Sequence, residues 1–233
     1  MSDNDASAPS GASVVRVWDL PTRVFHWLLA VALVAQVITG EVGGAALEWH
    51  LRIGYCIFAL LVFRVVWGVV GGHWSRFASF AYGPASMLRY VRGRPLHDDL
   101  FHVGHNPLGS ASVFAMLAML AIQVATGLVA DDEIATTGPL NRFVSNAVAL
   151  NATAWHKGPG LALILTLIVL HVGAIAFYTW RRGHDLVRPM VGGDKLLPGR
   201  VPASIDDRSA RVRALAIALV SAALVAAVVK LGG

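Results

Sequence analysis

The chain has 233 residues and a formal net charge of +5, and its composition is that of a membrane protein. Hydrophobic residues make up 56% of it and charged residues only 14%, about half the charged share of a soluble domain. This composition excludes a soluble globular enzyme. The sequence also has no aromatic-interleaved basic stretch in a soluble module, so no nucleic-acid partner is expected.

Five apolar blocks follow one another along the chain, at residues 24–39, 53–70, 110–130, 161–179 and 214–229. Each is close to the ~20 residues that a helix needs to cross a ~30 Å hydrocarbon layer, although the first and last are short. A membrane span must satisfy its own backbone, which leaves helices or a closed barrel. The blocks show no two-residue alternation, so we predict an all-α membrane protein with five helices and no soluble domain.

The N-terminal segment and the single cysteine have simple interpretations. Residues 1–14 are small and polar, lack the basic start of a signal peptide, and are predicted to be a disordered tail, with the first helix directing insertion. Cys56 is the single cysteine, which excludes a disulfide framework and a thiol metal site. We expect it to be a small core residue within the second block.

The distribution of Lys and Arg predicts the orientation. If the helices alternate in direction, fourteen basic residues lie on the side of the N-terminus, four lie on the opposite side, and one, Arg64, lies inside a block. Because positive charge stays in the cytoplasm, the N-terminus is predicted to be cytoplasmic and the opposite side periplasmic.

Nine histidines are present, and five have an ordinary interpretation as solvated or interfacial side chains near predicted loops: His73, His97, His102, His105 and His184. Of these, His105 is the most open question, because its segment GHNPLG immediately precedes the third block.

The other four histidines form a pattern. His26 lies at the cytoplasmic start of the first helix, His50 at the periplasmic start of the second, and His156 at the periplasmic start of the fourth. His171 follows fifteen residues later on the same helix. Fifteen residues turn through about 1500°, about 60° past four full turns, and rise ~22 Å, so both point to roughly the same side. His26 is therefore level with His171, and His50 with His156.

Two level-matched pairs indicate metal ligation. Ionisable residues in membrane helices are costly and usually mark a pathway or a cofactor. Any single one of these histidines could instead be an interfacial or hydrogen-bonded side chain. Zinc would require a compact tetrahedral set, whereas two facing imidazoles suit a metal held by two axial nitrogens. We predict that His26 and His171 hold one haem and His50 and His156 another; no catalytic side chain is predicted beside them.

Arg64 supports this interpretation. It lies fourteen residues after His50, about 40° short of four full turns, and so shares the His50 face at the cytoplasmic level. A haem propionate or an acidic headgroup would pair well with it. The alternative is that its stem lets the guanidinium reach the interface.

At this point the sequence resembles the bacterial di-haem cytochrome b family, membrane subunits related to the b-type cytochromes of nickel–iron hydrogenases. The resemblance covers most of residues 15–195 in the family's order. The segments that carry it are VWDLPTRVFHW at 17–27, FRVVWG at 63–68, GHNPLG at 104–109, TGL with Asp131 and Asp132, WHK at 155–157, and DLVRPMVGG at 185–193.

The resemblance implies a four-helix core over residues 15–195 that carries two b haems, held by the same two pairs of histidines. Residues 196–233 would be a linker and a fifth transmembrane helix outside that core. One departure concerns the fourth helix. The family usually separates its two ligands there by fourteen residues, and here the separation is fifteen, with Pro159 expected in the first turn.

The function that follows is electron transfer across a bacterial inner membrane, between the quinone pool and a periplasmic redox subunit or c-type cytochrome. We expect the loop 131–155 to dock the partner and a quinone to be reduced near the cytoplasmic haem, where Arg64 and Arg23 lie. SMLRYVRGR, within 71–109, would form an amphipathic lid there. The alternatives are a stand-alone oxidoreductase of the superoxide oxidase or quinone reductase type, and a haem-free transporter or assembly factor.

Overall fold

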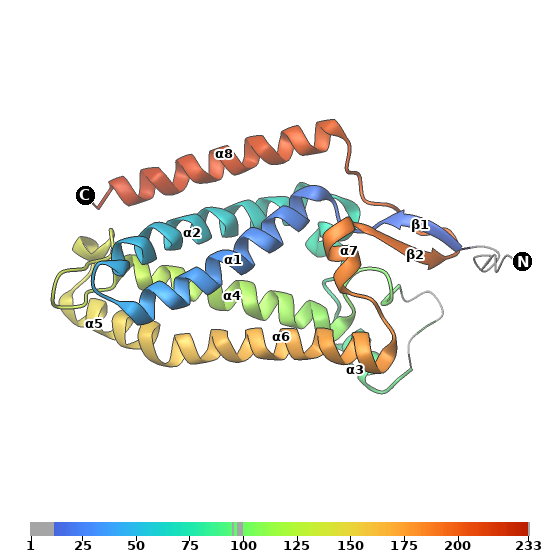
Figure 1. The fold of residues 1–233 in the computed structure, drawn as a ribbon, viewed down its shortest axis with the longest axis horizontal. Helices are drawn as coiled ribbons and strands as arrows, with labels where there is room; N and C mark the ends of the chain where they lie inside the picture. Colours follow the sequence, from blue (N-terminus) through green and yellow to red (C-terminus); the bar gives the residue numbers. More distant parts are fainter. Residues whose placement is uncertain (1–11, 95, 97–99, 233) are drawn as a thin grey trace, which may run out of the picture.

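The computed structural model describes residues 12–94, 96 and 100–232, so His97 lies outside the described residues. The described chain contains five helical segments long and apolar enough to cross a membrane, which confirms the predicted fold (Figure 1). They are α1 (Leu20–Val42), α2 (Ala46–Val70), α4 (Pro107–Val129), the segment Asn146–Arg182, and α8 (Arg208–Lys230).

Polar capping residues explain why α1, α4 and α8 begin before their apolar blocks. Asp19 caps α1 by accepting a hydrogen bond from the backbone of Thr22, at 2.8 Å. Asn106 caps α4 through Gly109 N at 2.8 Å, and Asp207 caps α8 through its side chain in the same way. A cap satisfies an amide that the first turn leaves free, so each helix starts at its cap and not at its first apolar residue.

The fourth span differs from the prediction. It starts at Asn146, with α5 (Asn146–Trp155), passes through a π turn (His156–Gly160), and continues as α6 (Leu161–Arg182). The expectation that His156 and Pro159 open this helix is therefore wrong. A π turn takes up one extra residue relative to an α-helix. His156 and His171 are fifteen residues apart, with the π turn between them. Their side chains therefore have the relative orientation that two residues fourteen positions apart have in an uninterrupted α-helix.

One end of the bundle carries a small two-stranded ribbon, which we call the ribbon end (Figure 1). Strand β1 (Ala12–Arg16) pairs antiparallel with β2 (Asp194–Pro198), so residues 12–14 belong to a strand and not to a disordered tail. The short helices α3 (Pro84–Val91) and α7 (Val187–Gly192) lie at this end too. The opposite end, called the far end, carries α5, the loop 130–145 and the C-terminal end of α8.

Helix α8 lies along α2 (Figure 1). Ala210, Ala214, Ser221 and Val225 are the buried residues of α8. Small residues let two helix backbones approach closely in lipid, where the hydrophobic effect does not drive association. Cys56 is exposed on α2, so the expectation of a core position is wrong.

A fully buried carboxylate, Asp19, joins three segments at the ribbon end. Besides capping α1, it accepts hydrogen bonds from Trp67 Nε1 at 3.1 Å, Gly72 N at 3.1 Å and Ser75 Oγ at 2.6 Å. Charge-assisted hydrogen bonds are stronger than neutral ones and offset the cost of burying a charge. Asp19 therefore fixes the start of α1 against the end of α2, and with it the position of His26 in the next two turns.

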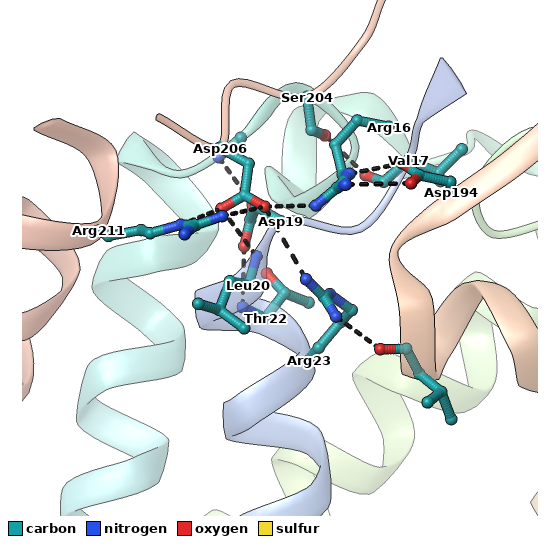
Figure 2. A network of polar contacts seen from close by, with 12 residues as sticks. Arg16, Val17, Asp19, Leu20, Thr22, Arg23, Asp194, Ser204, Asp206 and Arg211 are labelled. Carbon is teal, nitrogen blue, oxygen red and sulfur yellow. Dashed lines mark hydrogen bonds and ion pairs between the residues drawn. The ribbon is translucent and has the colours of Figure 1, made fainter. Parts of the chain in front are cut away.

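A second carboxylate, Asp206, ties the linker before α8 to the start of α1 (Figure 2). It accepts hydrogen bonds from Arg16 Nη1 at 2.7 Å, Arg211 Nε at 3.0 Å and Leu20 N at 3.1 Å. Burial acts to raise the pKa of Asp206, but the hydrogen bonds from Arg211 and Leu20 outweigh it and hold this pKa below its usual value. The fifth helix is thus anchored to the rest of the ribbon end.

Candidate functional site

The structure brings the four histidines together as two pairs, at opposite ends of the bundle. The ring centres of His26 on α1 and His171 on α6 are 6.4 Å apart near the ribbon end. Those of His50 on α2 and His156 in the π turn are 6.0 Å apart near the far end. All four side chains are half-buried.

These separations suit one metal ion between two facing rings. A metal–imidazole bond is about 2.0–2.1 Å long and the ligating nitrogen lies about 1.1 Å from the ring centre, so two opposed axial rings have centres roughly 6.3 Å apart. Direct hydrogen bonding between two imidazoles would bring the rings closer. Among the residues that the structure describes, no group of three or more His, Cys, Asp or Glu could hold a metal ion.

The far-end rings are held so that one nitrogen of each remains available. His50 Nδ1 lies 3.0 Å from the carbonyl oxygen of Gln36, and His156 Nδ1 lies 2.9 Å from that of Gln123. A carbonyl only accepts, so each Nδ1 carries the proton and each Nε2 keeps its lone pair. This is the usual arrangement of a ligating histidine, whose second nitrogen donates to a carbonyl or carboxylate.

Glycines make room for these rings, and a cavity opens beside them. A Cβ on Gly40 would lie 3.1 Å from the His50 ring, and a Cβ on Gly127 would lie 3.1 Å from the His156 ring. The cavity has a volume of about 400 Å³ and is lined by both histidines and both glycines. Ligand pockets span ~300–1,000 Å³, so the residues at the far end fit a planar group ligated by two imidazoles.

The ribbon-end pair has a different environment. His26 Nδ1 is buried and has no hydrogen-bond partner among the described residues. The Trp27 ring meets the His26 ring edge-on, with centres 5.0 Å apart. A buried polar nitrogen without a partner is costly, and within the described chain His26 Nδ1 lacks the carbonyl partner that holds each far-end ring.

Arg64 lies at the ribbon end of α2 and is only 3% exposed. Its guanidinium carbon is 4.6 Å from the centre of the Phe77 ring, and its Nη1 is buried without a hydrogen-bond partner in the described chain. The side chain therefore does not extend to the interface as the alternative interpretation proposed. A buried cation with a free donor suits an anionic group, and pairing of Arg64 with such a group stays a prediction.

His105 is not the solvated residue that its loop position indicated. Its ring packs against Trp18 and Phe80, with centres 4.8 and 4.6 Å away, and its Nδ1 is buried without a described partner. Burial, followed by the positive field of Arg64, lowers the pKa of His105 to about 3. It is therefore neutral at physiological pH and lies near Arg64, His26 and His171.

The remaining described histidines lie at the surface. His102 and His184 are exposed and His73 is partly exposed, in line with their ordinary interpretation. His184 stacks on Tyr178, with ring centres 6.2 Å apart.

Sequence reasoning missed the residues that hold the far-end rings. Gln36 and Gly40 belong to the segment QVITG at 36–40, and Gln123 and Gly127 belong to QVATG at 123–127. The two segments match at four of their five positions, and this internal repeat was the signal that could have found them. It is short, and only the structure shows that both copies face a histidine.

An all-α membrane bundle with facing imidazole pairs in its interior is the architecture of membrane proteins that hold metal cofactors between helices. The profile of the family described as prokaryotic cytochrome b561 matches residues 17–193. The chain belongs to this family, and it is therefore a multi-pass membrane b-type cytochrome that carries haem b and transfers electrons. Family membership overturns the haem-free alternative.

Individual relatives extend the similarity over most of the chain. A "Probable Ni/Fe-hydrogenase B-type cytochrome subunit" of Cupriavidus necator is 25% identical, over 82% of this chain and 91% of its own. The protein of the same name from Bradyrhizobium diazoefficiens is 26% identical, over 79% and 87%. A "Probable Ni/Fe-hydrogenase 1 B-type cytochrome subunit" of Escherichia coli K12 is 24% identical, over 67% and 80%. No solved structure matches the chain significantly.

Proposed function

We propose that this cytochrome holds two b haems and moves electrons across a bacterial inner membrane, from a periplasmic redox partner to the quinone pool. His50 and His156 would be the axial ligands near the periplasm, and His26 and His171 those near the cytoplasm. Haem b supplies one-electron oxidation and reduction at each position. The observation that carries the proposal is the pair of imidazole separations, 6.4 and 6.0 Å, at opposite ends of one bundle.

The role of the protein in this function is to hold and orient the rings and to exclude water. Backbone carbonyls of α1 and α4 fix the protonated nitrogens of the far-end histidines. Apolar residues between the two ends, including Ile57, Leu61, Leu120 and Ile164, are buried against one another. They place packed apolar side chains between the two sites.

We place the ribbon end in the cytoplasm. The ribbon end gathers fourteen Lys and Arg against four at the far end, and basic loops are retained in the cytoplasm. A fluorescent protein inserted into the loop 199–206 is expected to fluoresce in the cytoplasm, and a phosphatase fused to the C-terminus is expected to be active in the periplasm. Phosphatase activity at the loop 199–206, together with fluorescence at the C-terminus, would contradict this orientation.

The partner is proposed to be a redox enzyme that docks at the far end. The relatives named above are called subunits of nickel–iron hydrogenases, which supports a multi-subunit assembly. The docking segment is shorter than expected, since α5 occupies residues 146–155 of the loop 131–155. Ile134 in the remaining loop is 90% exposed and Phe143 is 61% exposed, so this loop offers apolar side chains to a partner.

The quinone is proposed to react near His26 and His171. Arg64 supports this position, since a buried cation stabilises negative charge that develops on a bound quinone. Arg23 contributes less than expected, because it donates to Val191 O at 2.5 Å and its Nη2 lies 3.9 Å from Asp206. Helix α3 exposes Leu88 and Val91 at the same end, consistent with a lid at the interface.

A quinone analogue added to membranes, with each haem followed by its optical spectrum, tests this function. We expect the analogue to shift the spectrum of the His26/His171 haem and to leave that of the His50/His156 haem unchanged. An effect confined to the latter would place the quinone site in the periplasmic half and contradict the proposal.

Purification from membranes under mild conditions tests the partner, and a second redox subunit should be retained. If the single chain alone oxidises a donor and reduces quinone, the stand-alone oxidoreductase is favoured.

A further inference from the structure

The far-end histidines are each held by one copy of the repeated segment described above, and the two copies make matching contacts. In QVITG the carbonyl of Gln36 meets His50 Nδ1, and the Cα of Gly40 faces the same ring. In QVATG the carbonyl of Gln123 meets His156 Nδ1, and the Cα of Gly127 faces that ring. The first copy lies on α1 and the second on α4, so the copies approach from different helices.

Helix geometry explains why Gln and Gly are spaced by four residues. In an α-helix the carbonyl of residue i already accepts from the amide of residue i+4, and its second lone pair stays free on the outer surface. A side chain at i+4 would cover that lone pair. Glycine at i+4 leaves it open, so an imidazole can reach the carbonyl of Gln36 or Gln123 from outside the helix.

The threonine before each glycine completes the pattern. Thr39 Oγ1 donates to Ala35 O at 2.7 Å and lies 3.2 Å from Gln36 O. Thr126 Oγ1 donates to Ile122 O at 2.9 Å, lies 3.1 Å from Gln123 O, and is also 3.2 Å from His156 Nδ1. Both hydroxyls therefore bond back to their own helix beside the carbonyl that holds the imidazole.

The ribbon-end pair lacks this arrangement at His26. His26 Nδ1 is buried and has no described hydrogen-bond partner, whereas the Nδ1 atoms of both far-end rings have carbonyl partners. An imidazole that donates from its second nitrogen to a carbonyl is a stronger base and a stronger electron donor to a metal. A stronger donor stabilises the oxidised metal.

We propose that the two segments QVITG and QVATG form a duplicated histidine cradle. The cradle orients both far-end imidazoles and strengthens them as donors, which makes the His50/His156 centre the lower-potential member of the two. The proposal rests on the proposed haem ligation and assigns Gln36, Gly40, Gln123 and Gly127 as positioning residues. A lower potential at the far end favours electron movement toward the ribbon end.

The test is to convert each cradle glycine separately, as Gly40→Ala and Gly127→Ala. The added Cβ would lie 3.1 Å from the ring in each case, so the ring must shift and its bond to the carbonyl must lengthen. Gly173→Ala is the matched control, because it is also a helical glycine and its Cβ would meet nothing within 4 Å. Each variant is purified, its haem is counted, its low-spin signals are recorded by electron paramagnetic resonance, and its haems are titrated electrochemically.

Both cradle variants are expected to change the low-spin signal of one haem and to raise the potential of that haem, or to release it, while the other haem is unaltered. The control should match the original protein. Unchanged signals in both cradle variants would overturn the proposal, as would equal changes at both haems. The two potentials of the unaltered protein give a second test that needs no glycine variant, once His50→Ala has shown which haem belongs to the far end. If that haem has the higher potential of the two, the cradle does not act as proposed.

Failure of the cradle and failure of the haem assignment give different results. If substitution of the four histidines does not remove haems pairwise, the ligation itself is wrong. If it does, and the glycine variants have no effect, only the cradle is wrong.

Discussion

Replacing any one of His26, His50, His156 or His171 by Ala is expected to reduce the haem content of the purified protein from two per chain to one. The reason is that each pair would hold one haem, and the alanine removes one of the two side chains that would hold it. At the far end the facing ring is expected to keep its position, since His50 and His156 have separate carbonyl partners. Pyridine haemochrome assays and total iron, each divided by protein, measure the result.

The four variants should also fall into two spectral classes. His26→Ala and His171→Ala are expected to lose the same haem, and His50→Ala and His156→Ala the other. The matched control is His102→Ala, because His102 is exposed at the ribbon end and contacts neither pair. Retention of both haems in any of the four variants, or a single haem in the unaltered protein, would contradict the assignment.

Replacing Arg64 by Leu is expected to lower the midpoint potential of the His26/His171 haem more than that of the His50/His156 haem. A nearby positive charge favours the reduced state, and Arg64 is buried at the level of the first pair. Partly screened charge interactions are worth on the order of 1–2 kcal/mol, which is roughly 40–90 mV for a one-electron couple. Redox titration of both haems, followed optically, measures the two shifts.

Two controls separate charge from packing. Arg64→Lys retains the charge but not the flat guanidinium that faces Phe77. The midpoint potential of the His26/His171 haem should therefore fall by less in this variant than in Arg64→Leu. Arg52→Leu removes an exposed arginine at the far end, where it is paired with Glu48, and should leave the potential of the His26/His171 haem unchanged. An equal or larger shift at the His50/His156 haem in Arg64→Leu would show that Arg64 does not act on the ribbon-end site.

The sequence predicted the membrane helices because their signal is local. A span needs a run of apolar residues of fixed length, and that run is visible without knowledge of any contact. The starts of three spans were less well predicted, because each begins where a polar side chain caps it. Asp19, Asn106 and Asp207 all precede the apolar runs by several residues.

The pairing of the histidines was also accessible, since it depends on helix direction and level rather than on detailed contacts. Alternating spans place His26 beside His171 and His50 beside His156, and the ring separations agree with this pairing. The direction in which His156 points from its helix could not be predicted from the sequence. It depends on the π turn at His156–Gly160, and the extra residue in that turn is recognisable only from backbone hydrogen bonding.

Composition, span length and charge distribution are summed along the chain, and the sequence alone therefore determined an all-α membrane protein with two level-matched histidine pairs. Only the tertiary structure decided what surrounds those pairs. The carbonyls that orient His50 and His156, the burial of Arg64 against Phe77, and the packing of His105 against Trp18 and Phe80 join residues from different segments. Such contacts depend on how helices approach one another, which packing fixes and local sequence does not.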